Sequence, residues 1–386
     1  MRFLHTADWQ LGMVRHVLDA DAQAQFAQAR LDAVGRMADL ARDTGCAFVV
    51  VAGDVFETNQ VDVRTVARAL DTLRSFDCPV YLLPGNHDPL DSASVWTSQA
   101  FTEDCPAHVH VLDDTRPVVP LPGVEVVGAP WRSKRPLSDL ATDAIGDLRH
   151  PGPDQIGDLR HPGPDRILVA HGAVRTLSPD PDALAAINQA ALEAAITDGR
   201  LAYVALGDRH STTSVGATGR VWYSGAPEPT AFREVDPGNA LVVELGEDGC
   251  EVTPHRVAQW HFVERTVDVG AGGDIAALEA ELDALPDKSR TVLRLAVRGT
   301  VTLSEHEELE GVLERAADLF AAVDQPARHR DVAIVPDDAD FASVPLSGYA
   351  AATRDELQRM AAGDDDQAGT AIDALGLLQR LAGRRS

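Results

Sequence analysis

The sequence predicts an α/β domain built on an open sheet, and three observations support this. Short apolar runs alternate with amphipathic helical segments over residues 1–255. Runs such as residues 48–52 and 203–206 are apolar throughout, which is typical of buried strands. Polar residues follow most of these runs directly, at the carboxyl ends of the strands, where open α/β sheets place their active sites.

The alternation predicts each element in turn. Buried strands are expected at residues 3–4, 48–52, 80–83, 124–127, 167–170 and 203–206. Helical patterns are expected to fill several of the gaps, for example at residues 20–41 and 61–73. Later strands at residues 221–223, 240–244 and 251–257 are expected to close the domain.

The pattern changes near residue 260 and predicts a smaller second unit. Apolar residues alternate with arginines over residues 293–298, which indicates a half-buried strand. Ser304 and Glu307 have the spacing of a capping box before a helix, and residues 332–335 form another apolar run. We therefore expect a strand–helix–strand–helix–strand unit over residues 259–345, after a first domain at residues 1–258.

Residues 346–386 are expected to form two helical segments, broken at residues 363–366. The second segment carries an apolar stripe at Ile372, Leu375, Leu378 and Leu381. This stripe either docks on a partner protein or packs on the chain's own surface, and the sequence leaves both interpretations open.

A tandem repeat interrupts the first domain. Residues 145–155 read IGDLRHPGPDQ, and residues 156–166 repeat them with only the last residue changed. A short repeat that occurs twice and is rich in proline and glycine is typical of an exposed loop. The histidines of the repeat, His150 and His161, are therefore poor ligand candidates.

The composition favours a soluble, cytoplasmic protein. No apolar run approaches the roughly 18 residues of a membrane span, and the first residues contain no apolar signal region. The four cysteines form no CxxC pair, which argues against a zinc–thiolate site. The net charge of −26 is adverse for a chain that binds DNA unaided, because phosphate neutralisation dominates that affinity. Either the substrate is not DNA, or metal ions and a partner subunit supply the positive charge.

Five polar motifs follow apolar runs and are expected to meet at one edge of the sheet. The five motifs contain the residues Asp8-Trp9-Gln10, Gly53-Asp54, Gly85-Asn86-His87-Asp88, His171-Gly172 and Gly207-Asp208-Arg209-His210. Carboxylate, amide and imidazole groups in this arrangement suit a dinuclear metal site that hydrolyses phosphate esters by in-line displacement. Each motif alone is weak evidence, whereas five in the same structural position are strong evidence.

These motifs resemble the signature of the calcineurin-like metallophosphoesterases. More narrowly, the segments HTADW at residues 5–9 and YVALG at residues 203–207 resemble SbcD-type DNA double-strand-break repair exonucleases. The resemblance covers roughly the first two thirds of the chain. It implies a two-sheet α/β/β/α sandwich, a small α+β cap domain that contacts DNA, and C-terminal helices that bind a partner.

The resemblance also implies a role for each site residue. One ion would be held by Asp8, Gln10, Asp54 and His210, and the other by Asp54, Asn86, His171 and Asp208. Asp54 would therefore bridge the two ions. His87 would protonate the leaving oxygen or stabilise the phosphorane, and Asp88 would orient His87.

The sequence departs from that family at two ligand positions. The family has histidine where this chain has Gln10 and again where it has Asp208. Both replacements offer oxygen, so the site should favour Mn²⁺, or Mg²⁺, over softer ions. A decayed, inactive site is the alternative interpretation.

The expected function is a Mn²⁺-dependent DNA exonuclease and endonuclease in double-strand-break repair and recombination. The resemblance implies action on DNA ends or hairpins, a coiled-coil ATPase subunit as partner, and a homodimer. Two alternatives remain: a phosphodiesterase for nucleotides or small diesters, and a non-catalytic scaffold that binds DNA ends or the ATPase.

The basic cluster at residues 131–135 either contacts phosphates or forms a solvated loop.

Overall fold

The computed structural model describes most of the chain in two units. Described are residues 1–148, 164–246, 249–270, 274–325, 330–334 and 348–361, with positions 367, 370–371, 374–375 and 377–378. The first unit comprises residues 1–16 and 23–260, and the second comprises residues 17–22 and 261–386. Most of the tandem repeat, with His150 and His161, lies outside the described residues.

Two six-stranded sheets form the first unit. The first sheet has the order β12-β11-β1-β2-β3-β4, and the second has the order β5-β6-β7-β8-β10-β9. The strands of the first sheet are β1 (Arg2–Thr6), β2 (Val49–Val51), β3 (Val80–Leu82), β4 (Val109–Val111), β11 (Asn239–Gly246) and β12 (Gly249–Arg256). Those of the second are β5 (Val118–Leu121), β6 (Val124–Ala129), β7 (Asp165–His171), β8 (Tyr203–Gly207), β9 (Thr213–Val215) and β10 (Val221–Tyr223). The predicted buried strands and closing strands are all present.

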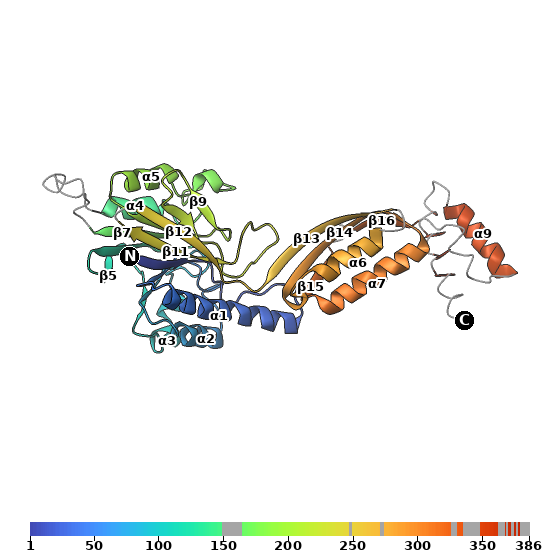
Figure 1. Ribbon diagram of the computed structural model, residues 1–386, viewed down its shortest axis with the longest axis horizontal. Helices are drawn as coiled ribbons and strands as arrows, with labels where there is room; N and C mark the ends of the chain where they lie inside the picture. The colour runs from blue at the N-terminus through green and yellow to red at the C-terminus, as the bar shows by residue number, and fades with distance from the viewer. Residues whose placement is uncertain are drawn as a thin grey trace. The chain divides into compact units, whose positions relative to one another are not determined.

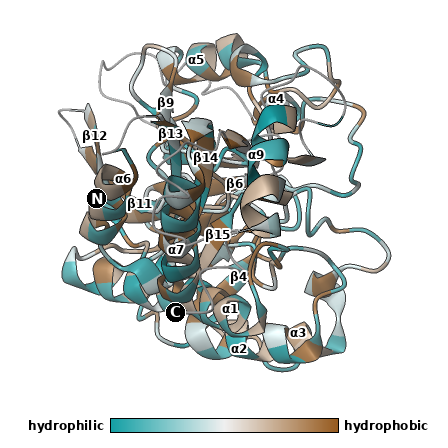
Figure 2. Cartoon of the chain, turned by 90° about the vertical axis from the view of Figure 1, so that its right-hand side faces the viewer, coloured by the Kyte–Doolittle hydropathy of each residue, from teal (hydrophilic) through white to brown (hydrophobic). Residues whose placement is uncertain are grey.

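Helices cover the outer face of each sheet, as Figure 1 shows. The main helices are α1 (Ala20–Asp43), α2 (Val63–Leu73) and α3 (Gln99–Thr102) beside the first sheet, and α4 (Leu140–Asp147) and α5 (Gln189–Thr197) beside the second. Helices α1 and α2 carry both hydrophobic and hydrophilic residues (Figure 2). The α/β/β/α sandwich implied by the resemblance is therefore confirmed.

The strands are apolar on both faces because each face packs against a different layer. In β7, Ile167 and Val169 belong to the core between the two sheets. Their neighbours Leu168 and Ala170 belong to the core beneath α4 and α5. Side chains alternate across a strand, so a strand buried on both faces needs a continuous apolar run. This is the pattern that identified the strands in the sequence.

The second unit is a smaller sheet covered by two helices. Strand β14 (Thr291–Val301) pairs in parallel with β13 (His261–Val269), β15 (Ala322–Asp324) and β16 (Arg330–Ile334). Helices α6 (Asp274–Ala284) and α7 (Leu303–Leu319) bury Leu278 and Leu309 against this sheet. The predicted alternation of strands and helices is present. The cap and partner-binding roles of residues 259–345 and 346–386 remain predictions.

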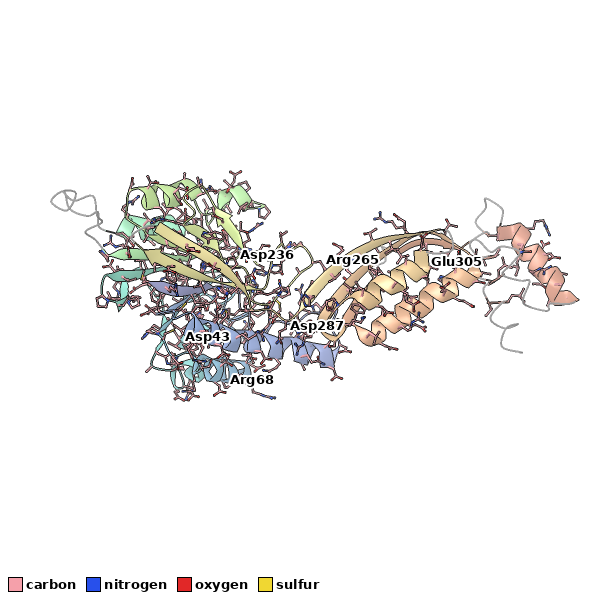
Figure 3. The ribbon with its side chains drawn as sticks, in the orientation of Figure 1. Asp43, Arg68, Asp236, Arg265, Asp287 and Glu305 are labelled. Carbon is pink, nitrogen blue, oxygen red and sulfur yellow. The ribbon has the colours of Figure 1, made fainter. Side chains whose placement is uncertain are left out.

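The capping box of α7 lies two residues before the predicted one. The Thr302 hydroxyl accepts from the Glu305 N–H at 3.2 Å, and the Glu305 carboxylate accepts from the Thr302 N–H at 2.8 Å. The prediction of Ser304 and Glu307 was wrong, although both pairs have the same spacing. Glu305 is labelled in Figure 3.

Part of the C-terminal stripe packs within the second unit. Helix α9 spans Tyr349–Ala361. Leu375 is fully buried in a cluster with Leu303 and Leu357, so this position does not offer its side chain to a partner. Ile372 and Leu381 lie outside the described residues. No helix in the described part of the chain combines the length and apolar character that crossing a bilayer requires.

Candidate metal centre

The five polar motifs meet where strands of both sheets end. Backbone hydrogen bonds join the loops within the first sheet, with the Asp8 N–H donating to Gly53 O at 3.0 Å and the Gln10 N–H donating to Asp54 O at 2.9 Å. A further bond crosses between the sheets, because the Asp208 N–H donates to the Asp8 carboxylate at 3.1 Å. Segments that lie 200 residues apart in the sequence are thereby fixed against each other.

The backbone is strained at four of the predicted ligands. Asp8, Gln10, Asp54 and Asp208 have φ values of 55°, 44°, 53° and 96°. Only two other non-glycine residues of the described chain, Asp236 and Asp287, have positive φ. Such conformations cost roughly 1–3 kcal/mol each and persist where surrounding structure enforces them, typically at functional sites. The strain therefore marks the same loops that the sequence singled out.

Two glycines allow the loops to approach closely. A Cβ atom at Gly85 would lie 2.2 Å from Oδ1 of Asp54, and one at Gly207 would lie 2.0 Å from Ala52 O. Both separations are far below van der Waals contact, so any side chain would force the loops apart. These glycines keep Asn86 and Asp208 within reach of Asp54.

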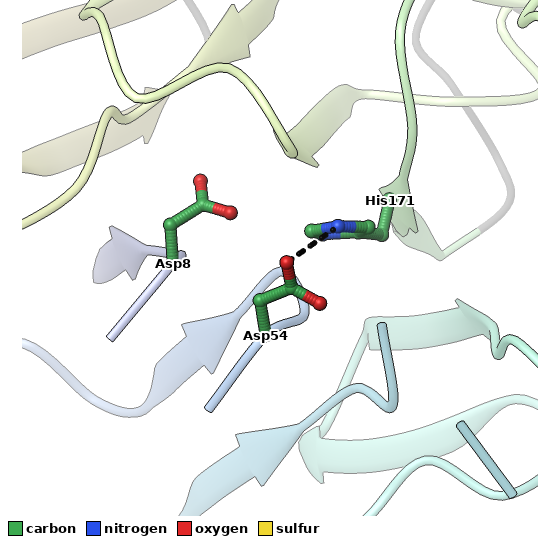
Figure 4. A group of neighbouring side chains, drawn as sticks. All are labelled: Asp8, Asp54 and His171. Atoms are coloured by element: carbon green, nitrogen blue, oxygen red, sulfur yellow. Dashed lines mark ion pairs between the residues drawn. The ribbon is translucent and has the colours of Figure 1, made fainter. Parts of the chain in front are cut away.

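One group of ligands, which we call the His171 half, consists of Asp54, Asn86, His171 and Asp208. Nε2 of His171 lies 2.6 Å from Oδ1 of Asn86 and 3.3 Å from Oδ2 of Asp54 (Figure 4). Its other nitrogen, Nδ1, lies 2.7 Å from the Ala52 carbonyl oxygen. Both ring nitrogens thus face acceptor oxygens. A neutral imidazole that donates from Nδ1 has only a lone pair at Nε2, and a proton or a cation at Nε2 would satisfy the oxygens that face it.

The second group, which we call the His210 half, consists of Asp8, Gln10 and His210. Nε2 of His210 lies 3.4 Å from Nε2 of Gln10 and 4.0 Å from Oδ1 of Asp8. Gln10 is 2% exposed, and its Oε1 atom has no hydrogen-bond partner among the described residues. A buried oxygen without a partner costs free energy unless something outside the chain binds it. A divalent cation would satisfy it.

Nδ1 of His210 is held by residues that the sequence analysis missed. It lies 2.9 Å from Oε1 of Glu234 and 2.8 Å from Oγ1 of Thr230. Glu234 also binds the Thr230 N–H at 2.8 Å, which fixes the carboxylate. A carboxylate that accepts from one imidazole nitrogen directs the other nitrogen, as a lone-pair donor, toward a metal. No sequence motif marked Glu234, because this contact joins two loops 24 residues apart.

The carboxylates of the site differ in their protonation. Burial raises the pKa of Asp8 to about 6, although His210 and His171 oppose this rise. Burial alone would raise the pKa of Asp54, but the neighbouring His171 and His87 outweigh burial and hold this pKa below its ordinary value. Burial raises the pKa of Asp208. Asp54 is therefore the carboxylate that stays ionised most readily, as a bridging ligand must.

The expected contact between Asp88 and the His87 ring is not present in the described residues. The Asp88 carboxylate instead accepts from the backbone N–H groups of Gly85 at 2.7 Å and Phe56 at 2.9 Å. His87 points Nδ1 toward Glu57, 2.9 Å from its carbonyl oxygen and 3.9 Å from its carboxylate. Asp88 thus shapes the loop, and the acidic neighbours of the His87 ring are Glu57 at Nδ1 and Asp54 at Nε2. Sequence reasoning missed Glu57, although it lies three residues after Asp54.

Three of the seven predicted ligands lie close enough together to hold a cation. Atoms of Asp8, Asp54 and His171 lie within 4.8 Å of one another, so this group contains residues of both halves. A bound cation would satisfy the unpartnered Gln10 oxygen and would also explain the oxygens that face Nε2 of His171. Five of the seven residues offer oxygen, and such a donor set suits Mn²⁺ or Mg²⁺.

The fold and the site together define the protein class. The chain belongs to the calcineurin-like phosphoesterase family, whose pattern matches residues 1–212. This family membership, with the candidate metal site, supports a metal-dependent phosphoester hydrolase.

Curated relatives and one solved structure are similar to parts of the chain. A 91-residue stretch is 31% identical to the DNA double-strand break repair protein Mre11 of Methanococcus maripaludis, covering 23% of each chain. The chain is 24% identical over 277 residues to SbcD, a subunit of the SbcCD nuclease of Bacillus subtilis, covering 66% of this chain and 68% of that protein. A dimetal phosphatase from Danio rerio covers 66% of this chain and 96% of its own, with 14% identity and a TM-score of 0.43. The match to the Mre11 protein thus spans about a quarter of that relative's length.

Proposed function

We propose that this protein is a Mn²⁺-dependent DNA nuclease that hydrolyses phosphodiester bonds as an exonuclease and endonuclease. The observation that carries the proposal is the convergence of seven ligand-competent side chains at one edge of a phosphoesterase sandwich. The names of two relatives, a DNA double-strand break repair protein and a nuclease subunit, support DNA as the substrate. Family membership supports the hydrolysis itself.

The ligands of the two ions follow from the two halves of the site. Asp8, Gln10 and His210 would hold one ion, and Asn86, His171 and Asp208 would hold the other. Asp54 would contact both. Nδ1 of His171 lies 2.7 Å from the Ala52 carbonyl oxygen and would donate its proton there, which would direct the Nε2 lone pair into the site. Glu234 does the same for His210.

The chain's own residues would position the phosphodiester and move the proton. Two bound divalent ions supply charge neutralisation at the phosphoryl oxygens and lower the pKa of water. His87 holds its Nδ1 at the Glu57 carbonyl, and its Nε2 lies 4.0 Å from Oδ2 of Asp54. Nε2 is therefore the atom that faces the site, and we assign it the proton given to the leaving oxygen. The carboxylate of Glu57 would stabilise the protonated ring.

We further propose that the protein acts in double-strand-break repair with a coiled-coil ATPase subunit. The B. subtilis relative is named as one subunit of a larger nuclease, which supports a partner. A partner would also offset the net charge of −26, which disfavours DNA binding by this chain alone. The homodimer expected from the resemblance stays a prediction, to be checked by light scattering.

The net charge favours a second candidate, a phosphodiesterase for nucleotides or small diesters. Purified protein with Mn²⁺ should be assayed on linear duplex DNA and on bis(p-nitrophenyl) phosphate. The nuclease proposal expects cleavage of both, with loss of both in the His87→Ala variant. Hydrolysis of the small ester alone, with or without added ATPase partner, would favour the second candidate. Activity on neither, with no bound metal by elemental analysis, would indicate a non-catalytic scaffold.

A further inference from the structure

The backbone that follows His171 is held by two aromatic side chains. His171 is the last residue of β7, and the chain turns sharply after it, where Gly172 has a φ of 137°. The indole N–H of Trp131 donates to His171 O at 2.7 Å. The hydroxyl of Tyr223 donates to Gly172 O at 2.7 Å and accepts from the Val174 N–H at 2.9 Å. Three backbone groups beside a proposed metal ligand are thus each bound by an aromatic side chain.

The two aromatic residues come from opposite sides of β7 in the sheet. Trp131 follows shortly after β6, which pairs with β7 on one side. Tyr223 is the last residue of β10, which lies beyond β8 on the other side of β7. Both residues are buried. Because buried hydrogen bonds that are fully satisfied make a structure rigid, these bonds restrict where the turn can place His171.

Trp131 also joins His171 to the loop that carries Asn86. Its backbone N–H donates to Pro84 O at 3.1 Å, and its carbonyl accepts from the Leu90 N–H at 2.8 Å. Pro84 and Leu90 lie on either side of Asn86 in the sequence. The backbone of Trp131 therefore holds both ends of the Asn86 loop, while its indole holds the backbone of His171. The contact of 2.6 Å between Asn86 Oδ1 and His171 Nε2 lies between the two segments that Trp131 joins.

The separation of these two segments bears on the size of the ion that the His171 half would hold. Mg²⁺ demands near-ideal octahedral geometry with ligands at about 2.0–2.1 Å, whereas Ca²⁺ accepts ligands at about 2.3–2.6 Å in more flexible sites. Two segments that are held together favour a small ion, and two segments that can move apart would admit a larger one.

We propose that Trp131 and Tyr223 are positioning residues that hold His171 close to Asn86, and that they thereby set the affinity and the size preference of the ion in the His171 half. The proposal rests on the metal-dependent function proposed above and deepens it. Both residues act through the backbone at residues 171–174 and not as ligands. A purely structural role would change the stability of the fold without changing which ion the site prefers.

Tyr223→Phe makes the smallest change, because it removes one hydroxyl and keeps the ring. Calorimetry on the full chain measures the affinities for Mn²⁺ and Ca²⁺, and His171→Ala identifies which affinity belongs to the His171 half. Loss of a group that orients a metal ligand typically costs about 10–100-fold in affinity, so the Mn²⁺ affinity of this half should fall about tenfold. The other Mn²⁺ affinity should not change. The Ca²⁺ affinity should fall less, so the preference for Mn²⁺ over Ca²⁺ should narrow.

Tyr203→Phe is the matched control. Tyr203 is also fully buried, and its hydroxyl contacts Nδ1 of His5 at 3.1 Å instead of the backbone beside a proposed ligand. Both tyrosine variants should lower the melting temperature by a similar amount, measured by circular dichroism, but only Tyr223→Phe should change the ion preference. Trp131→Phe removes the indole N–H and keeps an aromatic ring, and it should change the ion preference in the same direction as Tyr223→Phe.

The outcomes separate this proposal from the proposed function. An unchanged ion preference in Tyr223→Phe or in Trp131→Phe, or an equal change in Tyr203→Phe, would overturn the positioning role while the nuclease function stands. If one of the two variants does not fold, the other decides alone. If wild type binds two ions but cleaves neither DNA nor bis(p-nitrophenyl) phosphate, the nuclease proposal fails, and the affinities still decide the positioning role. If wild type binds no ion, both proposals fail.

Discussion

The two halves of the candidate metal centre share an architecture but differ in how tightly their atoms are held. In the His171 half, Nε2 of His171 lies 2.6 Å from Asn86 Oδ1 and 3.3 Å from Asp54 Oδ2, although Asp208 Oδ1 is 3.9 Å away. In the His210 half, the corresponding separations are 3.4 and 4.0 Å, and Gln10 Oε1 has no partner among the described residues. Nε2 of His171 therefore has two short contacts within its half, whereas Nε2 of His210 has none shorter than 3.4 Å to Gln10 or Asp8.

The difference follows from what fixes each imidazole. Nδ1 of His171 is held by the carbonyl of Ala52, which directly follows β2 in the centre of the first sheet. Nδ1 of His210 is held by Thr230 and Glu234, which lie on a loop. Sheet backbone is rigid, while loops move more readily. We therefore expect one strong and one weak ion site, which calorimetry with Mn²⁺ would resolve as two unequal affinities.

The largest effect is expected from Asp54→Asn, which removes the residue common to both halves. A metal-bridging carboxylate supports several kcal/mol of charge stabilisation, so kcat should fall by about 10³-fold or more. Both ion affinities should weaken, as measured by calorimetry. Asp236→Asn is the control, because Asp236, which is labelled in Figure 3, has positive φ but is not a proposed ligand. Retention of one full-affinity ion in Asp54→Asn would contradict the bridging role.

Glu234→Gln should weaken only the His210 half. Loss of a carboxylate that orients a metal-binding histidine typically costs about 10–100-fold in metal affinity. Calorimetry should show the weaker Mn²⁺ site losing affinity while the stronger one is unchanged. Glu193→Gln is a matched control, because Glu193 also binds loop backbone, at Ala217 and Thr218. Equal weakening of both sites would show that the halves are not independent.

Lowering the pH should release ions from both halves, because protons compete with cations for the ligands. The Asp8 pKa of about 6 means that this carboxylate takes up a proton as the pH falls through 6, which opposes cation binding in the His210 half. Burial lowers the pKa of both imidazoles, but Asp54 outweighs it at His171 and Glu234 outweighs it at His210, so both pKa values are raised and imidazole protonation opposes binding in both halves. The number of bound Mn²⁺ ions, measured by electron paramagnetic resonance, should therefore fall between about pH 7 and 5. Retention of two ions at pH 5 would contradict this prediction.

The positions of the ligands were predictable from the sequence, whereas their orientations were not. Parallel strands bring their carboxyl ends to one edge, so residues such as Asp8, Asp54 and Asn86 had to lie near one another. The role of Asp88 depended on the path of a tight loop. There the carboxylate turned back to the N–H groups of Gly85 and Phe56. Neighbouring acidic residues cannot be ranked by spacing alone.

The same limit applies to the fold. Strands buried on both faces, such as β7, can be recognised in the sequence because burial on both faces requires a continuous apolar run. The capping box of α7 was placed two residues late because Thr302 and Ser304 both have glutamate three residues later. Burial of Leu303 in the first turn favours the earlier start, and that is a tertiary effect. Local signals identify the element, and packing sets its boundary.

The smallest effect, and the sharpest test of the comparison, is expected from Gln10→His. An imidazole at this position restores the residue type of the resembled family and replaces an amide oxygen with a softer, stronger ligand. Mn²⁺ affinity of the weaker site should rise only a few-fold, because Mn²⁺ accepts oxygen and nitrogen donors alike. Zn²⁺ affinity should rise more, since zinc prefers imidazole. Competition calorimetry with the two metals measures this change in preference, and Asp208→His provides the parallel change in the His171 half.

If the asymmetry arises from the loop that holds His210, the weaker site should stay the weaker one in Gln10→His. If the two affinities become equal, the asymmetry comes from the glutamine itself.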